Sequence, residues 1–200
     1  MKKAIYIAGA VTLVLLGGCN TSKKEANEEN FGLAINNALA TQGQMCLPAT
    51  KWPTIASLRQ GTNEATGMTR EGLEALESIG LAKSIDTTQE VEISWGKTRK
   101  QQVKSYSLTE AAQAYLHDEG QLCWGQKVVD RIVSWSEPSN NQSSILYVYK
   151  ISSVATWANS DEIQNAFPSV KSGIAGAGRD QNHCMADITK NGWQANCPLS

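Results

Sequence analysis

Hydrophobic and polar positions divide the first part of the chain into three segments of different character. Residues 4–16 are apolar apart from Thr12, whereas residues 20–30 are polar and charged. From Asn30 onward, apolar residues recur at the spacing of an amphipathic helix, and this predicts a helix that ends near Gly43. The polar segment holds too few apolar residues to enter a core, so we expect it to be a solvated linker between the first segment and the folded protein.

The middle of the chain alternates between helical and strand patterns. Thr69 is a good helix N-cap, and Leu73 begins a helical repeat of apolar residues. Residues 90–96 and 103–108 alternate in the manner of strands, with a polar tip between them. A further helix is expected to begin at Thr109. The order predicted here is therefore helix, hairpin, helix.

The second half of the chain is richer in strand patterns. Long strands are expected over residues 122–138 and 144–152, the second of which is apolar on both faces and therefore central in its sheet. Short helical turns that end at Pro168, a glycine-rich loop over residues 171–182 and a strand near residues 185–189 should follow. The whole pattern predicts an α+β fold that contains a small antiparallel sheet.

The first nineteen residues have the features of an export signal. Two lysines precede an apolar core that is shorter than the roughly 20 residues of a membrane-spanning helix. The motif LLGGC at residues 15–19 resembles the lipobox of bacterial lipoproteins. This resemblance implies a signal peptide over residues 1–18, attachment of acyl chains to Cys19 and a lipidated tether over residues 19–30. Asn20 after the cysteine implies sorting to the outer membrane, with the protein facing the periplasm and membrane lipid as its first partner.

If Cys19 carries lipid, the other cysteines of the chain can all pair with one another. Four cysteines remain, and an even number in an exported chain indicates disulfide bonds. Three pairings are open, of which we favour Cys46–Cys123 and Cys184–Cys197. A zinc site is the weaker alternative, because no two cysteines have C-x2-C spacing. We expect neither a metal nor a cofactor.

The central segments also resemble a known fold. LEALESIGLAKS at residues 73–84 is similar to the recognition helix and wing entry of bacterial winged-helix proteins, and YSLTEAAQAYL at residues 106–116 is similar to the corner after the wing. This implies a single periplasmic domain over residues 31–200, stapled by disulfides. Its first half, about residues 31–118, should be winged-helix-like, and residues 119–200 should form a β-rich half.

A second resemblance extends over more of the chain. CWGQKVV at 123–129, YVYKISSVATWA at 147–158 and NGW at 191–193 are similar to segments of uncharacterised proteobacterial lipoproteins. The family has no established activity, so this resemblance implies fold and location but no chemistry.

The tip of the predicted hairpin carries a cluster of positive charge. Four basic residues fall within eight positions: Lys97, Arg99, Lys100 and Lys104. They form either a solvated tip or a contact for anionic lipid headgroups or an acidic partner. Nucleic acid is not an expected ligand, because the preceding helix is acidic, the net charge of the chain is -1, and export separates the protein from DNA.

No arrangement of catalytic residues emerges from the sequence. The chain has two histidines, His117 and His183, and no serine in a G-x-S-x-G motif. We expect most of the six tryptophans to pack in the core, with Trp193 the best candidate for exposure. These observations favour a non-catalytic binding or accessory module of the cell envelope, with an envelope protein as its further partner. The alternatives are an envelope hydrolase or enzyme inhibitor with a dispersed site and, less favoured, a DNA-binding protein.

Overall fold

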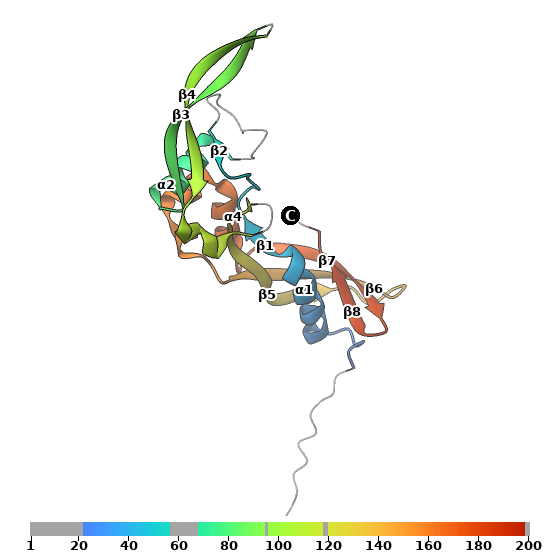
Figure 1. Ribbon diagram of the computed structural model, residues 1–200. Coiled ribbons are helices and arrows are strands. Elements are labelled where there is room, and N and C mark those ends of the chain that lie inside the picture. Colours follow the sequence, from blue (N-terminus) through green and yellow to red (C-terminus); the bar gives the residue numbers. More distant parts are fainter. Residues whose placement is uncertain (1–21, 57–67, 95, 118–119, 199–200) are drawn as a thin grey trace, which may run out of the picture.

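Two antiparallel sheets organise the chain in the computed structural model (Figure 1). The structure describes residues 22–56, 68–94, 96–117 and 120–198, except for the side chains of residues 91–94. One sheet has five strands in the order β1-β5-β6-β7-β8, and the other has three in the order β2-β4-β3. The prediction of an α+β fold with antiparallel sheets and disulfides is confirmed.

The five-stranded sheet forms one end of the molecule. Its strands are β1 (Gln44–Cys46), β5 (Cys123–Trp135), β6 (Gln142–Ser152), β7 (Gln181–Thr189) and β8 (Gly192–Asn196). The prediction of a central strand is confirmed for β6, which lies between β5 and β7. Ile145 and Tyr147 on one face of β6 and Val148 on the other are all buried, so both faces are covered.

Helix α1 (Glu28–Gln42) covers one face of this sheet (Figure 1). The side chain of Asn27 caps its first turn by accepting a hydrogen bond from the backbone N–H of Asn30. Phe31, Ile35 and Leu39 point into the core at helical spacing. The helix ends at Gly43, as the sequence predicts.

The structure corrects the expected tether over residues 19–30. The side-chain amide of Asn30 donates to the backbone carbonyls of Ser22 and Glu25, each at 2.9 Å. The indole N–H of Trp193 donates to the same Glu25 carbonyl at 3.1 Å. Residues 22–30 are therefore folded against the sheet, because their backbone carbonyls, which a polar sequence does not reveal, are bound by side chains. Trp193 is buried rather than exposed, which corrects a second expectation.

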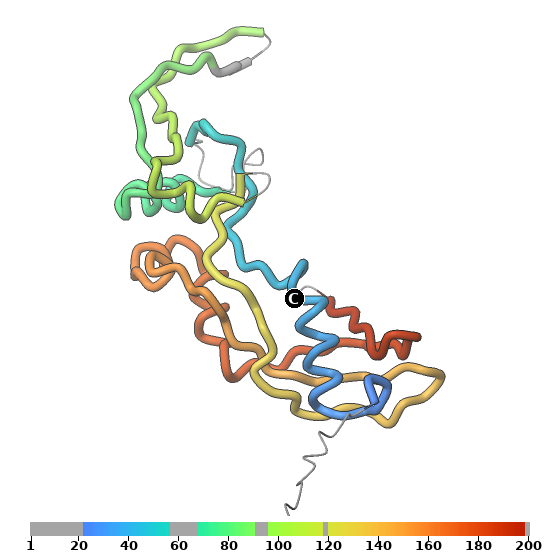
Figure 2. Tube along the Cα trace, turned by 60° about the horizontal axis from the view of Figure 1, so that its bottom comes forward, coloured from blue at the N-terminus to red at the C-terminus, as the bar shows by residue number. Residues whose placement is uncertain are grey.

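The three-stranded sheet carries a long hairpin that projects from the body of the molecule (Figures 1 and 2). Its strands are β2 (Thr54–Ile55), β3 (Ala82–Ser94) and β4 (Lys97–Leu108). Helix α2 (Arg70–Ser78) precedes the hairpin, and the predicted cap is confirmed because the Thr69 hydroxyl accepts from the Gly72 N–H. Gly80, with φ of +78°, turns the chain from this helix into β3.

The segment after Thr109 is a 3₁₀-helix, η1 (Glu110–Tyr115), rather than the expected amphipathic α-helix. The Thr109 hydroxyl donates to the Gly80 carbonyl at 2.7 Å and does not cap the following turn. This tertiary bond ties the start of η1 to the turn after α2.

Three short helices follow β6: η3 (Thr156–Asn159), α3 (Asp161–Ala166) and α4 (Pro168–Gly176). Of these, α3 packs beside α2 and contacts the other two. The structure corrects the expected glycine-rich loop, because much of residues 171–182 belongs to α4. The previous turns end before Pro168, as expected, because α3 stops at Ala166. Pro168 also begins α4, since proline is favoured in the first helical turn, where its missing N–H costs no hydrogen bond. Gly173 is glycine for a packing reason, because a Cβ there would lie 2.7 Å from Met45 and 2.9 Å from Trp124.

The hydrophobic core consists of two clusters. One lies between α1 and the five-stranded sheet, and the other gathers α2, α3, α4 and the inner end of the hairpin. The expected division at about residue 118 differs from this arrangement, because α1 packs on β5 and β8 and not on α2. A boundary drawn along the sequence could not anticipate that the first helix crosses to the later strands.

Both favoured disulfide bonds are present. Cys46–Cys123 joins β1 to the start of β5, where the two residues are paired across the strands. Cys184–Cys197 joins β7 to the residue after β8, and both cysteines are buried. The two bonds thus fasten both edge strands of the five-stranded sheet to their neighbours.

Candidate ligand-binding cleft

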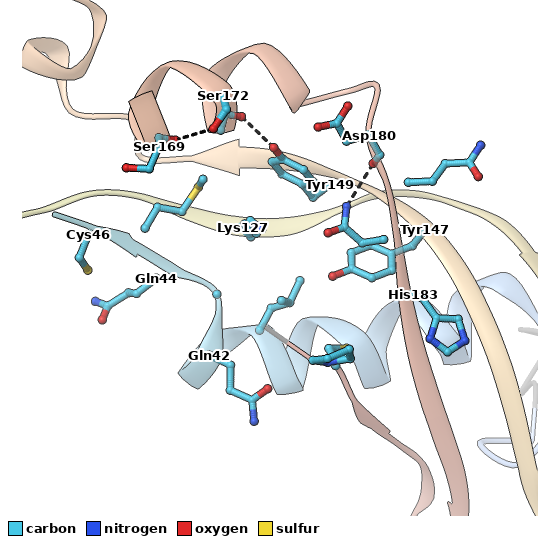
Figure 3. A pocket seen from close by; sticks show the side chains of 18 of the residues that line it. Gln42, Gln44, Cys46, Lys127, Tyr147, Tyr149, Ser169, Ser172, Asp180 and His183 are labelled. Atoms are coloured by element: carbon cyan, nitrogen blue, oxygen red, sulfur yellow. Dashed lines mark hydrogen bonds between the residues drawn. The ribbon is translucent and has the colours of Figure 1, made fainter. Parts of the chain in front are cut away.

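A cleft of about 890 Å³ opens at the end of α1 (Figure 3). Its walls come from the last turn of α1, from β1, β5, α4, β6 and β7, and from the segment after β8. Polar and aromatic side chains line much of it, among them Gln44, Lys127, Tyr147, Tyr149, Asp180 and Asn182. This volume lies within the range of about 300–1,000 Å³ that small-molecule sites occupy.

The early end of α1 creates this opening. Tyr147 and Tyr149 continue the same face of β6 as Ile145, which α1 covers. The helix stops at Gly43, where a Cβ would lie 2.7 Å from both the Gln126 side chain and the Leu39 carbonyl. The sheet face beyond that point is left to α4 and β7 to enclose, and the cleft is the space between them.

The ammonium group of Lys127 is held inside the cleft by an aromatic ring. Its Nζ lies 4.8 Å from the ring centroid of Tyr149, which is a cation–π contact. Burial lowers the pKa of Lys127, and the carboxylate of Asp180 opposes this only in part. Within the part of the chain that the structure describes, this ammonium has no ion pair with a carboxylate.

The two tyrosines of the cleft differ in their hydrogen bonding. Both side chains are 3% exposed. The Tyr149 hydroxyl donates to the Gly173 carbonyl of α4 at 2.8 Å. The Tyr147 hydroxyl has no hydrogen-bond partner among the described residues, and it points into the open space of the cleft (Figure 3). Burial is the main cause that raises the pKa of each tyrosine, so both phenols are neutral at physiological pH.

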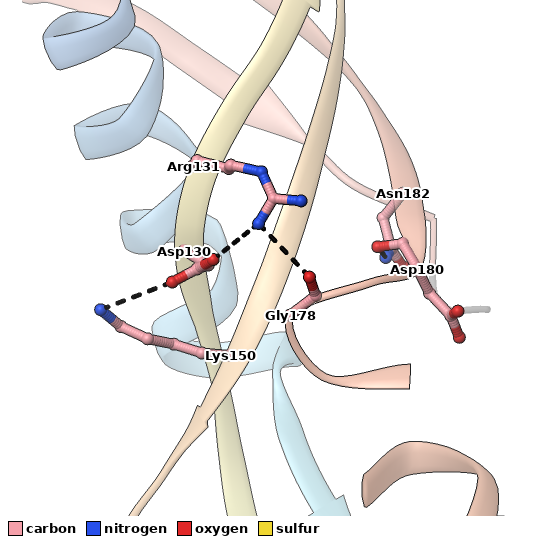
Figure 4. Close-up of polar contacts among 6 residues, drawn as sticks. All are labelled: Asp130, Arg131, Lys150, Gly178, Asp180 and Asn182. Atoms are coloured by element: carbon pink, nitrogen blue, oxygen red, sulfur yellow. Dashed lines mark hydrogen bonds and ion pairs between the residues drawn. The ribbon is translucent and has the colours of Figure 1, made fainter. Parts of the chain in front are cut away.

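A tight turn places Asp180 on the wall opposite β1. The Gly178 N–H donates to the Tyr149 carbonyl and the Asp180 N–H donates to the Gly176 carbonyl, both at 2.8 Å. Arg131 holds the same turn from outside by donating to the Gly178 carbonyl at 3.3 Å (Figure 4).

A small network of charges orients Arg131 in turn. Its Nη1 lies 2.9 Å from a carboxylate oxygen of Asp130, and Lys150 Nζ lies 4.0 Å from the other oxygen (Figure 4). Exposed pairs of this kind contribute about 0–1 kcal/mol each. Their effect here is positional, because they fix the backbone that carries Asp180.

The hairpin does not bring its four basic residues together. Lys97 and Arg99 alternate with Lys100 and Lys104 along β4, so the two pairs lie on opposite faces. Lys100 is paired in register with Glu90 of the neighbouring strand.

Lys104 has acidic neighbours of its own. It is paired in register with Asp86, and its Nζ lies 3.9 Å from a carboxylate oxygen of Glu77. Acidic residues on β3 and α2 thus offset part of the positive charge of β4. The four basic residues do not form a single basic face.

The remaining sequence candidates lie away from the cleft chemistry or outside the described residues. Cys19 and the segment 1–18 fall outside the described part of the chain. Among the described residues, no helix is long and apolar enough to cross a bilayer, and no group of three histidine, cysteine or acidic side chains could hold a metal ion.

His183 lies in β7 rather than in the polar loop that the sequence suggested. Its Nε2 is 2.7 Å from the Ser144 hydroxyl. His183 is paired in register with Leu146, whose side chain points to the face of β6 opposite Tyr147. His183 therefore lines only the border of the cleft, and its bond to Ser144 lies on the face of the sheet opposite Tyr147.

Sequence reasoning missed the residues that form the cleft. Lys127 stood in a mostly apolar strand pattern, and Tyr147 and Tyr149 were assigned only to a buried sheet face. The sequence did contain one indication of the site. A lysine and two tyrosines occupy positions that the strand pattern assigns to the core, and polar groups at such positions need partners.

Comparison of the chain with protein-family models, with curated proteins and with solved structures found no match.

Proposed function

We propose that this protein is a lipid-anchored, non-catalytic binding protein of the bacterial cell envelope. The cleft beside α1 is its binding surface. The observation that carries the proposal is a pair of polar groups that face this cleft, the half-buried Lys127 ammonium and the hydroxyl of Tyr147, neither of which has an ion pair or a hydrogen bond within the described protein. Both groups are therefore free to bind a ligand that enters the cleft.

The N-terminal features support the location. The lipobox-like LLGGC motif supports anchoring through acyl chains on Cys19 in the outer membrane, with the folded part in the periplasm. The presence of two disulfide bonds is in keeping with an oxidising compartment. Since only residues 20 and 21 separate Cys19 from Ser22, where the described structure begins, the anchor would hold the N-terminal end of α1 close to the membrane.

The hairpin region supports a second contact surface. We infer a winged-helix-like arrangement for α2, β3, β4 and η1, because the helix leads through a tight turn into a long hairpin and the third strand, β2, pairs with β4. Charge division along β3 and β4 argues against a nucleic-acid surface, so an envelope protein is the partner that this element would contact.

The alternative of an envelope hydrolase receives less support. Asp180 is the one carboxylate among the described residues that line the cleft, whereas glycoside hydrolysis ordinarily uses two. Among the described residues, no carboxylate is hydrogen-bonded to the imidazole of His183, so the Ser144–His183 pair lacks the orienting group of a hydrolytic triad. An inhibitor of another enzyme would be a binding protein whose partner is that enzyme.

Mass spectrometry and site-specific crosslinking test the proposal. Mass spectrometry of the mature protein should show acylation at Cys19 and loss of residues 1–18. A photo-reactive amino acid in place of Ser172, which lines the cleft, should form adducts in cells, and the same group at Glu137, on an exposed loop, should not. An unmodified Cys19 would contradict the anchor. Absence of adducts at Ser172, or equal adducts at both positions, would contradict the cleft as the binding surface.

A further inference from the structure

The unpaired groups of the cleft restrict what kind of ligand it accepts. We propose that the ligand carries a carboxylate, which binds between the Lys127 ammonium and the Tyr147 hydroxyl. This inference rests on the proposed function, because it names the chemistry of the molecule that occupies the same cleft.

The ammonium group of Lys127 favours an anionic ligand. Its ammonium is half-buried against the Tyr149 ring, and the described residues offer it no ion pair. A cation removed from water needs either a counter-charge or hydrogen-bond acceptors. The depressed pKa of Lys127 reflects the same desolvation, and a bound anion would raise that pKa again.

Tyr147 supplies a second donor on the same side. Its side chain is 3% exposed, and its hydroxyl, without a partner among the described residues, points into the cleft. The neighbouring Tyr149 shows what a satisfied phenol in this protein looks like, since its hydroxyl donates to the Gly173 carbonyl. The Tyr147 hydroxyl can therefore donate a hydrogen bond to an acceptor atom of a ligand.

The two donors face the same part of the cleft. Lys127 Nζ lies over the ring of Tyr149, and Tyr147 is the next residue on the same face of β6. A carboxylate has two oxygens, so one such group can accept a charge-assisted hydrogen bond from each donor.

The surrounding charge favours a carboxylate over a phosphate. Lys127 is the one basic side chain, apart from the imidazole of His183, among the described residues that line the cleft, and the Asp180 carboxylate is near enough to act on the pKa of Lys127. One cation neutralises the single charge of a carboxylate. A phosphate near neutral pH carries between one and two negative charges, and its excess would be repelled by Asp180.

The rest of the cleft indicates the size and polarity of the molecule. Gln44, Ser172 and Asn182 line it with amide and hydroxyl groups, and Trp124 contributes an aromatic edge. A short peptide with a free C-terminus and an acidic sugar both have this chemistry, a carboxylate on a small body rich in hydrogen-bonding groups.

Calorimetric titration of the full mature protein in detergent distinguishes these sources. The probes are the dipeptide Ala-Ala and its C-terminal amide, glucuronic acid and glucose, and inorganic phosphate. We expect at least one carboxylate probe to bind at millimolar concentration or below, and its neutral counterpart to bind more weakly by about tenfold or more, the worth of a charge-assisted hydrogen bond.

Matched variants connect that binding to the two donors. Lys127→Met should weaken the carboxylate probe by about tenfold or more, whereas Lys127→Arg should restore most of the affinity because it keeps the charge. Tyr147→Phe removes only the hydroxyl and should weaken binding several-fold. Lys171→Met, an exposed lysine of α4 outside the cleft, should leave affinity unchanged. Circular dichroism and urea unfolding verify that each variant is folded.

Several results would overturn the inference. These are equal binding of the carboxylate and neutral probes, binding of phosphate alone, no carboxylate binding at all, or affinity that Lys127→Met leaves intact. If adducts at Ser172 persist in cells while the carboxylate probes fail, the cleft is a binding surface for another chemistry. The proposed function would then stand without this inference.

Discussion

The two disulfide bonds should stabilise the protein by different amounts. They close loops of very different length, because their cysteines are separated by 77 and by 13 residues. In the chain-entropy model, a cross-link stabilises the folded state by reducing the freedom of the unfolded chain, and it does so more for longer loops. The model gives about 4.5 kcal/mol for Cys46–Cys123 and about 2.9 kcal/mol for Cys184–Cys197, a difference of about 1.6 kcal/mol.

The measurement should compare oxidised and reduced forms of the same sequence. Replacing Cys184 and Cys197 by Ala leaves one bond, and replacing Cys46 and Cys123 by Ala leaves the other. For each variant, the free energy of unfolding in urea is measured before and after reduction, so that any cavity left by the substitutions cancels. Alkylation followed by mass spectrometry verifies the thiol state.

Reduction should cost more in the variant that retains Cys46–Cys123. Equal losses in the two variants, or a larger loss for Cys184–Cys197, would refute the loop-length reasoning. The latter result would mean that burial of Cys184 and Cys197 decides their contribution, since both lie in the core whereas Cys46 and Cys123 are partly exposed.

Two further predictions concern a pair of glycines and one carboxyl group. Gly32→Ala should stabilise the protein by about 0.5–1 kcal/mol, because the position is helical and open, whereas Gly72→Ala should destabilise it by about 1–3 kcal/mol, since the new methyl would lie 2.8 Å from Phe167. Urea unfolding measures both, and a shift of the same sign in the two variants would contradict the packing argument. The Ser84 hydroxyl donates to Glu77 at 2.6 Å and is the main cause that lowers the pKa of that carboxyl, so Ser84→Ala should raise this pKa toward its ordinary value in an NMR titration. The stability that this bond contributes should be present above the ordinary carboxyl pKa and lost as pH falls through the lowered one; an unchanged Glu77 pKa would disprove its assigned cause.

Local patterns predicted the elements better than their partners. Thr69 capped a helix as expected, and Gly43 ended one, because caps and stops depend on neighbouring backbone groups. Pro168 follows the end of the preceding turns, as expected, but it also begins α4. A proline marks a boundary of either kind, and the sequence did not reveal that the glycine-rich segment continues as a helix whose Gly173 packs against Met45 and Trp124.

Charge patterns were equally ambiguous along one strand. Four basic residues close in sequence suggested one basic surface, but alternation along β4 divides them between two faces. The acidic neighbours that offset them come from β3 and from Glu77 of α2, and pairing across strands is invisible until the register is known. Trp193 shows the same limit, because its burial depends on the carbonyl of Glu25, 168 positions earlier.

The sequence by itself determined the α+β class, the long antiparallel strands, the helix cap at Thr69 and the two favoured disulfide bonds. These properties depend on periodicity and composition, which are local. The tertiary structure alone decided where α1 packs, how far the folded part extends toward the N-terminus, and that Lys127, Tyr147 and Asp180 line one cleft. Lys127 lies on β5, Tyr147 on β6 and Asp180 in the turn before β7, and only strand pairing together with the early end of α1 brings their side chains to a common opening.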